Sequence, residues 1–173
     1  MVSAIALASS SALALVLAPE AGGAPVVCTI RGDNGPDVLT GTPLSDVICG
    51  YGGADVIRGL GGNDRLLGGG GPDRVYGGGG DDRVFGGWGD DRLVGGERND
   101  IVHGGRGRDG LFGQAGGDRL FGEGGRDRLF GGLARDLLYA RDGKQDRVDG
   151  DAGRDCARVD RGLDVTVSVH ELF

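Results

Sequence analysis

The sequence predicts an all-β protein whose short parallel strands wind into a parallel β-roll (a β-solenoid) with two nine-residue units in each coil. Aspartate recurs at every ninth residue from Asp37 to Asp136, with glycine five residues before each one and an aliphatic residue two residues after it. Glycine also accounts for 40 of the 173 residues. The glycines do not recur at every third residue, so a collagen helix is excluded and a repeat architecture remains.

Each unit predicts one strand and one turn. We number a unit from its glycine, so that the aspartate is position six and the aliphatic residue is position eight. Side chains alternate between the faces of a strand, so positions seven to nine should form a short strand in which only position eight points inward. The other six residues form the turn, and each unit stacks on the next unit but one, with about 4.8 Å between coils.

The repeat resembles a known family. The units GGGGDDRVF (77–85) and GGWGDDRLV (86–94) match the pattern of hemolysin-type, RTX-like calcium-binding repeats. The resemblance is strict over residues 32–139 and looser to about Cys156. It implies a right-handed roll with Ca²⁺ bound between successive turns by position-six carboxylates and turn carbonyls. The expected calcium ligands are Asp37, Asp46, Asp55, Asp64, Asp73, Asp82, Asp91, Asp100, Asp109, Asp118, Asp127 and Asp136.

Calcium is expected to be required for folding, because stacked carboxylates on one side of the roll repel one another without a cation. Extracellular calcium modules often bind at roughly 10⁻⁴ to 10⁻³ M, so the chain would fold after export. Position four should be glycine, yet Leu44, Arg98 and Ala134 occupy it in the second, eighth and twelfth units. All three are even-numbered units, which predicts tighter sites on the odd-numbered side.

The ends of the chain are predicted to differ from the repeats. Residues 1–24 form an apolar run ending in small residues, which indicates a secretory signal peptide and an extracellular protein with no membrane span once it is removed. The run lacks the basic residues that usually begin a signal peptide, so the possibility that the start of the chain is misassigned stays open. Residues 25–31 form an N-terminal cap, residues 32–139 the twelve calcium-binding units, and residues 140–173 degenerate repeats with a closing strand over 164–170.

The three cysteines allow two interpretations. In an exported protein Cys28 and Cys49 would form a disulfide at the N-terminal cap, because both fall on the same side of the roll. Cys156 would then be unpaired or joined to another chain. The alternative is three reduced cysteines.

The outward positions carry arginine and aromatic residues. The formal charge of −7 argues against nucleic acid as a partner, because no net basic footprint is present. The arginine and aromatic columns are compatible with a cell-wall, glycan, acidic-polymer or protein partner; the simpler interpretation is that they cover the sheets and neutralise nearby aspartates. The columns comprise Arg65, Arg74, Arg83, Arg92, Arg119 and Arg128 at position seven, and Tyr76, Phe85, Phe112, Phe121, Phe130 and Tyr139 at position nine.

No catalytic pattern is present: the sequence has no HExxH, no GxSxG and no phosphate-binding loop, and His103 and His170 are isolated. The sequence therefore predicts a structural or adhesion module rather than an enzyme. Two alternatives compete with it. The chain could be the calcium-dependent C-terminal module of a larger exported enzyme or toxin, which an upstream reading frame would favour. An ice-binding roll is disfavoured, because its outward columns would carry Thr or Asn rather than Arg.

Overall fold

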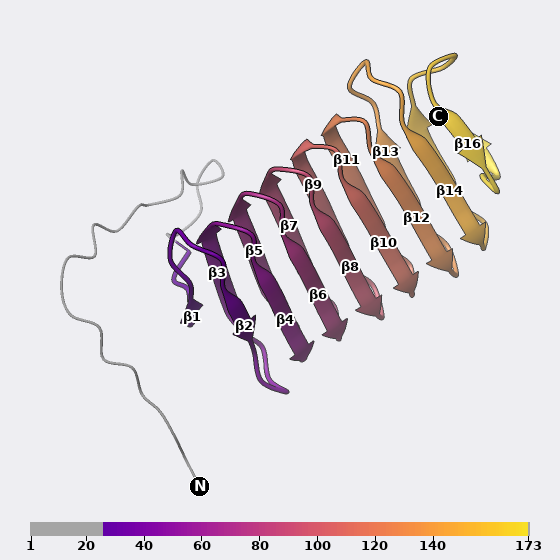
Figure 1. Cartoon of the computed structure of the whole chain (residues 1–173). Helices are drawn as coiled ribbons and strands as arrows, with labels where there is room; N and C mark the ends of the chain where they lie inside the picture. Colours follow the sequence, from indigo (N-terminus) through magenta and orange to yellow (C-terminus); the bar gives the residue numbers. More distant parts are fainter. Residues whose placement is uncertain (1–25, 173) are drawn as a thin grey trace, which may run out of the picture.

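The protein is a two-sheet parallel solenoid, seen in a computed structural model that describes residues 26–172 (Figure 1). One sheet contains β1 (Ile30–Arg31), β3 (Val47–Gly52), β5 (Arg65–Gly70), β7 (Arg83–Trp88), β9 (Ile101–Gly107), β11 (Arg119–Gly125), β13 (Leu137–Ala140), β15 (Cys156–Val159) and β17 (Glu171–Leu172). The other contains β2 (Val38–Thr40), β4 (Val56–Gly61), β6 (Arg74–Gly79), β8 (Arg92–Glu97), β10 (Gly110–Ala115), β12 (Arg128–Leu133), β14 (Arg147–Ala152) and β16 (Val165–Val167). We call them the odd and even sheets. The described residues contain no helix, and thus none that could cross a membrane.

The strand register confirms two units per coil. Leu66 pairs with Ile48 on one side and with Val84 on the other, eighteen residues away in each direction. Near the C-terminus the step becomes nineteen, since Leu129 pairs with Val148. The extra residue lies between β13 and β14, where the nine-residue spacing of the sequence slips by one.

The strands are longer than the sequence predicted. A typical strand covers positions seven to nine of one unit and positions one to three of the next, as in β5. Alternation along these six residues turns position one inward as well as position eight, and both are buried in β5, at Gly68 and Leu66. Within positions seven to nine, position eight is the inward residue, as predicted. The strand also extends over positions one to three, so position one is a second inward residue and the turn shrinks to positions four to six.

The core is one continuous aliphatic column in each sheet. The position-eight side chains from Ile48 to Leu138 are all 0 % exposed, and Leu39 in the first coil is 9 % exposed. Val148 and Ala157 extend the columns, also at 0 % exposure, so the repeats after residue 139 are better formed than the sequence indicated. β16 then ends the even sheet within the predicted closing strand, and β17 ends the odd sheet.

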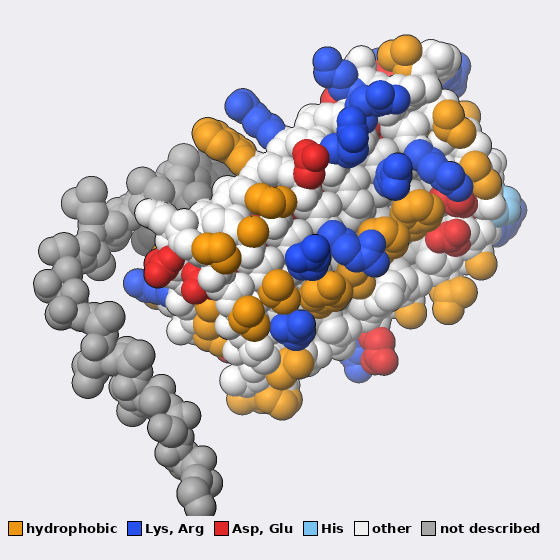
Figure 2. Space-filling model, viewed as in Figure 1, with side chains coloured by type: hydrophobic (Ala, Val, Ile, Leu, Met, Phe, Trp, Pro, Cys, Tyr) orange, Lys and Arg blue, Asp and Glu red, His pale blue; other side chains and the backbone are white. Residues whose placement is uncertain are grey.

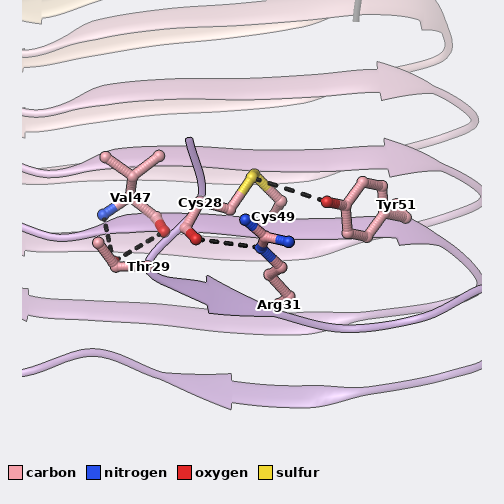
Figure 3. Close-up of a disulfide and its surroundings, with 6 residues drawn as sticks. All are labelled: Cys28, Thr29, Arg31, Val47, Cys49 and Tyr51. Atoms are coloured by element: carbon pink, nitrogen blue, oxygen red, sulfur yellow. Dashed lines mark hydrogen bonds between the residues drawn. A yellow bond between two sulfur atoms is a disulfide. The ribbon is translucent and has the colours of Figure 1, made fainter. Parts of the chain in front are cut away.

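A disulfide between Cys28 and Cys49 fastens the N-terminal cap, as predicted (Figure 3). The two α-carbons are 5.9 Å apart, and the bond ties the chain before β1 to β3. Thr29 strengthens the junction, because its N–H donates to the carbonyl of Val47 at 2.7 Å. Cys156 is buried and unpaired. The predicted signal peptide, residues 1–24, lies outside the described residues.

Candidate metal centre

The position-six aspartates form two columns inside the roll, one at each row of turns. Each side chain folds inward after its three-residue turn, and its Oδ1 accepts a hydrogen bond from the backbone N–H of the aspartate one coil earlier. Asp91 Oδ1, for example, accepts from the N–H of Asp73 at 2.8 Å, and Asp109 Oδ1 accepts from that of Asp91 at 2.8 Å. One carboxylate oxygen in each unit is thus used to join successive coils.

The other oxygen, Oδ2, has no hydrogen-bond partner. It is buried in every unit from the third onward, and in most of these units it lies beside the inward-facing glycine at position one. A buried carboxylate oxygen without a donor or cation is costly, so it marks a place where a cation would be stabilising. The residues with such an oxygen are Asp55, Asp64, Asp73, Asp82, Asp91, Asp100, Asp109, Asp118, Asp127, Asp136, Asp146 and Asp155.

Ten of the twelve expected ligands therefore share one geometry, and Asp37 and Asp46 depart from it. Both lie in the first coil and are half-buried. Asp37 Oδ2 accepts from the N–H of Asp33 at 2.7 Å, and Asp46 Oδ2 accepts from the N–H of Thr42 at 2.7 Å. These two aspartates close their own turns, because the sequence has no position-six aspartate eighteen residues before either of them.

Asp146 and Asp155 were not among the expected ligands, although they have the same buried, unpartnered oxygen as the others. The signal was present in the sequence, because the nine-residue spacing resumes at these two positions after the one-residue slip. The weak position-eight pattern of the last units had concealed it.

Burial raises the pKa of the eleven position-six carboxyl groups from Asp55 to Asp146. Desolvation is the largest cause: it raises the pKa of Asp73 to about 6, of Asp91 to about 7 and of Asp100 to about 8. The backbone hydrogen bond to each group opposes this effect, and repulsion from neighbouring aspartates adds to it. Without a cation, several of these groups would hold a proton near neutral pH.

Backbone carbonyl oxygens complete the candidate donor set. Residues 26–172 contain no cluster of three acidic, histidine or cysteine side chains close enough to hold a metal, so side chains alone do not form a site. The carbonyl oxygen of Gly104 lies beside Asp91 Oδ2 near Gly86, and the carbonyl of Gly53 points across the coil gap at Gly71. Carboxylate and carbonyl oxygens without nitrogen or sulfur are the donors preferred by a hard cation such as Ca²⁺.

A comparison with protein families indicates which cation such donors bind. The family model described as the RTX calcium-binding nonapeptide repeat matches residues 29–66, 58–93, 85–120, 112–144 and 121–156, which is most of the chain. The chain belongs to this family. A search of curated proteins returned no match. The repeat is a calcium-binding structural module rather than a catalytic unit, and the donors described above fit the ion that the RTX repeat binds.

The RTX turns tolerate the departures at position four better than the sequence indicated. Arg98 has φ of 76° and Ala134 has φ of 82°, the left-handed conformation that glycine adopts at this position in other units. These residues keep the turn at a cost of about 1 to 2 kcal/mol each. Leu44, in the first coil, does not adopt the left-handed conformation.

The difference in calcium affinity between the odd-numbered and the even-numbered units stays a prediction. Asp73 belongs to the odd-numbered fifth unit and Asp100 to the even-numbered eighth unit, whose turn contains the strained Arg98. Asp73→Ala should therefore lower the number of bound calcium ions or the stability more than Asp100→Ala. Thermal unfolding and native mass spectrometry of both variants in calcium measure this. Equal losses would show that the strain at Arg98 does not weaken its site.

Proposed function

We propose that this chain is an exported module that folds when calcium binds between its coils, with the inward position-six carboxylates as the acidic ligands. The observation that carries the proposal is the column of unpartnered Asp Oδ2 atoms at each row of turns. The RTX repeats and the choice of oxygen donors support calcium as the ion. Within the roll, calcium would supply the positive charge that two stacks of buried carboxylates lack.

Export is supported by the disulfide of the N-terminal cap, because disulfides persist in oxidising compartments outside the cytoplasm. Such compartments also supply the calcium concentrations that a weak site needs. A site filled at ten times its Kd stabilises the folded state by about 1.4 kcal/mol, and a series of such sites would decide whether the chain folds. The biological role proposed for the folded roll is structural or adhesive.

Calcium titration followed by far-ultraviolet circular dichroism tests this proposal. With the calcium removed at pH 7.5, the spectrum should be that of a largely unfolded chain, and the β-sheet signal should appear with a midpoint of roughly 0.1 to 1 mM calcium. Magnesium at the same concentration should be much less effective, because it demands a tighter octahedral geometry and gives up its water reluctantly. An equally strong β-sheet spectrum with and without calcium would refute the proposed function.

A further inference from the structure

The roll separates its charges, with the aspartates inside and the arginines outside. Thirteen aspartates are buried, twelve of them the position-six residues with an unpartnered oxygen. Residues 26–172 hold all 19 Lys and Arg residues but 25 of the 26 acidic residues, so twelve acidic residues remain unburied. The outer surface thus has an excess of seven positive charges, although the formal charge of the chain is −7.

The arginines do not neutralise the aspartate columns. Among the arginines of the described residues, only two form ion pairs: Arg141 with Asp160 at 3.8 Å, and Arg147 with Asp149 at 3.7 Å. Neither partner is a position-six aspartate. The outward arginines thus form no ion pair with the position-six aspartates, although Arg147 pairs with the nearby Asp149, and most of the arginine charge is available to a partner.

A groove of about 620 Å³ lies beside the start of β12 and β14. Arg108, Arg126, Arg128 and Arg147 line it, with Phe130 as an apolar wall. Arg108 and Arg126 occupy the same turn position in adjacent coils, so their charges repeat at about 4.8 Å along the roll. We call these four arginines the arginine groove. Asp127 and Asp146 also border it, but their free oxygens are turned into the interior.

Aromatic side chains beside the arginines form the predicted ladders. The Phe112 and Phe130 rings stack at 5.1 Å, and the guanidinium groups of Arg92 and Arg147 lie 4.2 Å and 5.8 Å from their respective centres. Figure 2 shows hydrophobic and arginine side chains lying next to one another along one face of the roll. Because neighbouring rings and guanidinium groups already cover these ring faces, bases of a single-stranded nucleic acid would find few free rings to stack on.

We propose that the calcium-loaded roll binds an acidic polysaccharide along the arginine groove, a step that rests on the proposed function. A linear polymer with regularly spaced carboxylate or sulfate groups matches these arginines, because Arg108, Arg126 and Arg128 form no ion pair and the first two repeat one coil apart. Guanidinium groups bind such oxyanions well. Calcium controls the interaction, because without it the chain is unfolded and exposes its full negative charge. The net negative charge of the chain alone therefore does not exclude nucleic acid, and the covered ring faces are what disfavours it.

Dextran sulfate is the test ligand, measured by isothermal titration in millimolar calcium at low salt, with uncharged dextran as the polymer control. The groove variant combines Arg108→Gln, Arg126→Gln and Arg128→Gln. A control variant of equal net charge combines Arg83→Gln, Arg98→Gln and Arg119→Gln, which change the odd sheet and the opposite row of turns. Circular dichroism in calcium establishes that each variant folds.

The wild-type roll should bind dextran sulfate but not dextran, and high salt should abolish binding. The groove variant should have a Kd about tenfold higher than that of the wild type, as expected for three lost charge contacts. The control variant should raise the Kd by less than about twofold. Equal weakening in both variants would overturn the proposal, because net charge alone or calcium bridging would then explain binding. Binding of poly(dT) as tight as that of dextran sulfate would also overturn it in favour of a nucleic acid.

Two further outcomes separate this inference from the proposed function. A roll that folds with calcium but does not bind dextran sulfate overturns the arginine groove as a binding site and leaves calcium-dependent folding intact. A chain whose folding ignores calcium refutes the proposed function, and calcium-independent binding by that chain would overturn calcium control of the groove.

Discussion

Calcium-free protein should become more stable as the pH falls from 8 to 5.5, the opposite of what deprotonated, paired aspartates would produce. The folded-state pKa values of the position-six aspartates from Asp55 to Asp146 are raised, to about 7 at Asp91 and about 8 at Asp100, above an unfolded value near 3.8. Between these values the folded state binds more protons than the unfolded state, so stability is greatest at low pH and is lost as the pH rises through the folded pKa values.

Far-ultraviolet circular dichroism of protein stripped of calcium by a chelating resin measures this. The chain is expected to be largely unfolded near pH 7.5, so its β-sheet signal should increase as the pH falls from 8 to 5.5 and the carboxyl groups take up protons. In saturating calcium the signal should change little over the same range, so the stabilisation by calcium should shrink on acidification. A calcium-free protein that is more stable at pH 8 would show that these carboxylates are not buried without metal in the folded state.

Gly86→Ala should destabilise the calcium-loaded roll by about 3 kcal/mol, because position one faces a fully packed interior. A methyl group there would overlap Asp91 Oδ2 and approach the carbonyl oxygen of Gly104 to 2.6 Å. Both oxygens belong to the candidate donor set, so the substitution should also reduce the number of bound calcium ions.

Gly110→Ala is the matched control. Gly110 is the outward position seven of β10, and a methyl group there would meet only the edge of the Phe112 ring, at 3.3 Å, and looser contacts beyond it. The free energy of unfolding of this variant should lie within about 0.5 kcal/mol of the wild-type value, as is usual for surface substitutions. Chemical denaturation of both variants in calcium measures the difference. Similar stabilities for Gly86→Ala and Gly110→Ala would mean that position one is not packed as described.

The sequence predicted the architecture because the nine-residue period is strict and the role of the aliphatic position follows from a single unit. An aliphatic residue at every ninth position can be buried only if units stack, and this determined the order of the strands and the buried column that includes Leu66 and Val84. The disulfide of Cys28 and Cys49 followed from the same register.

Other features depend on contacts between coils and could not be predicted from one unit alone. The glycine at position one was expected to serve the turn, but in Gly86 it instead makes room for the carboxylate of Asp91 inside the roll. The different contacts of the two carboxylate oxygens also depend on stacking. Oδ1 accepts a hydrogen bond from the previous coil, and Oδ2 has no hydrogen-bond partner. The separation of buried aspartates from outward arginines could not be predicted from net charge, because net charge does not show which charged side chains point inward.

Counting calcium ions in two neighbouring aspartate variants tests the central claim most directly. Asp91→Asn alters an inward carboxylate, whereas Asp90→Asn alters the exposed residue beside it, whose Oδ1 accepts from the N–H of Arg108 at 2.8 Å. Native mass spectrometry in calcium should show fewer bound ions than wild type for Asp91→Asn and an unchanged number for Asp90→Asn. Equal ion counts in the two variants would contradict the assignment of the inward columns as the calcium ligands.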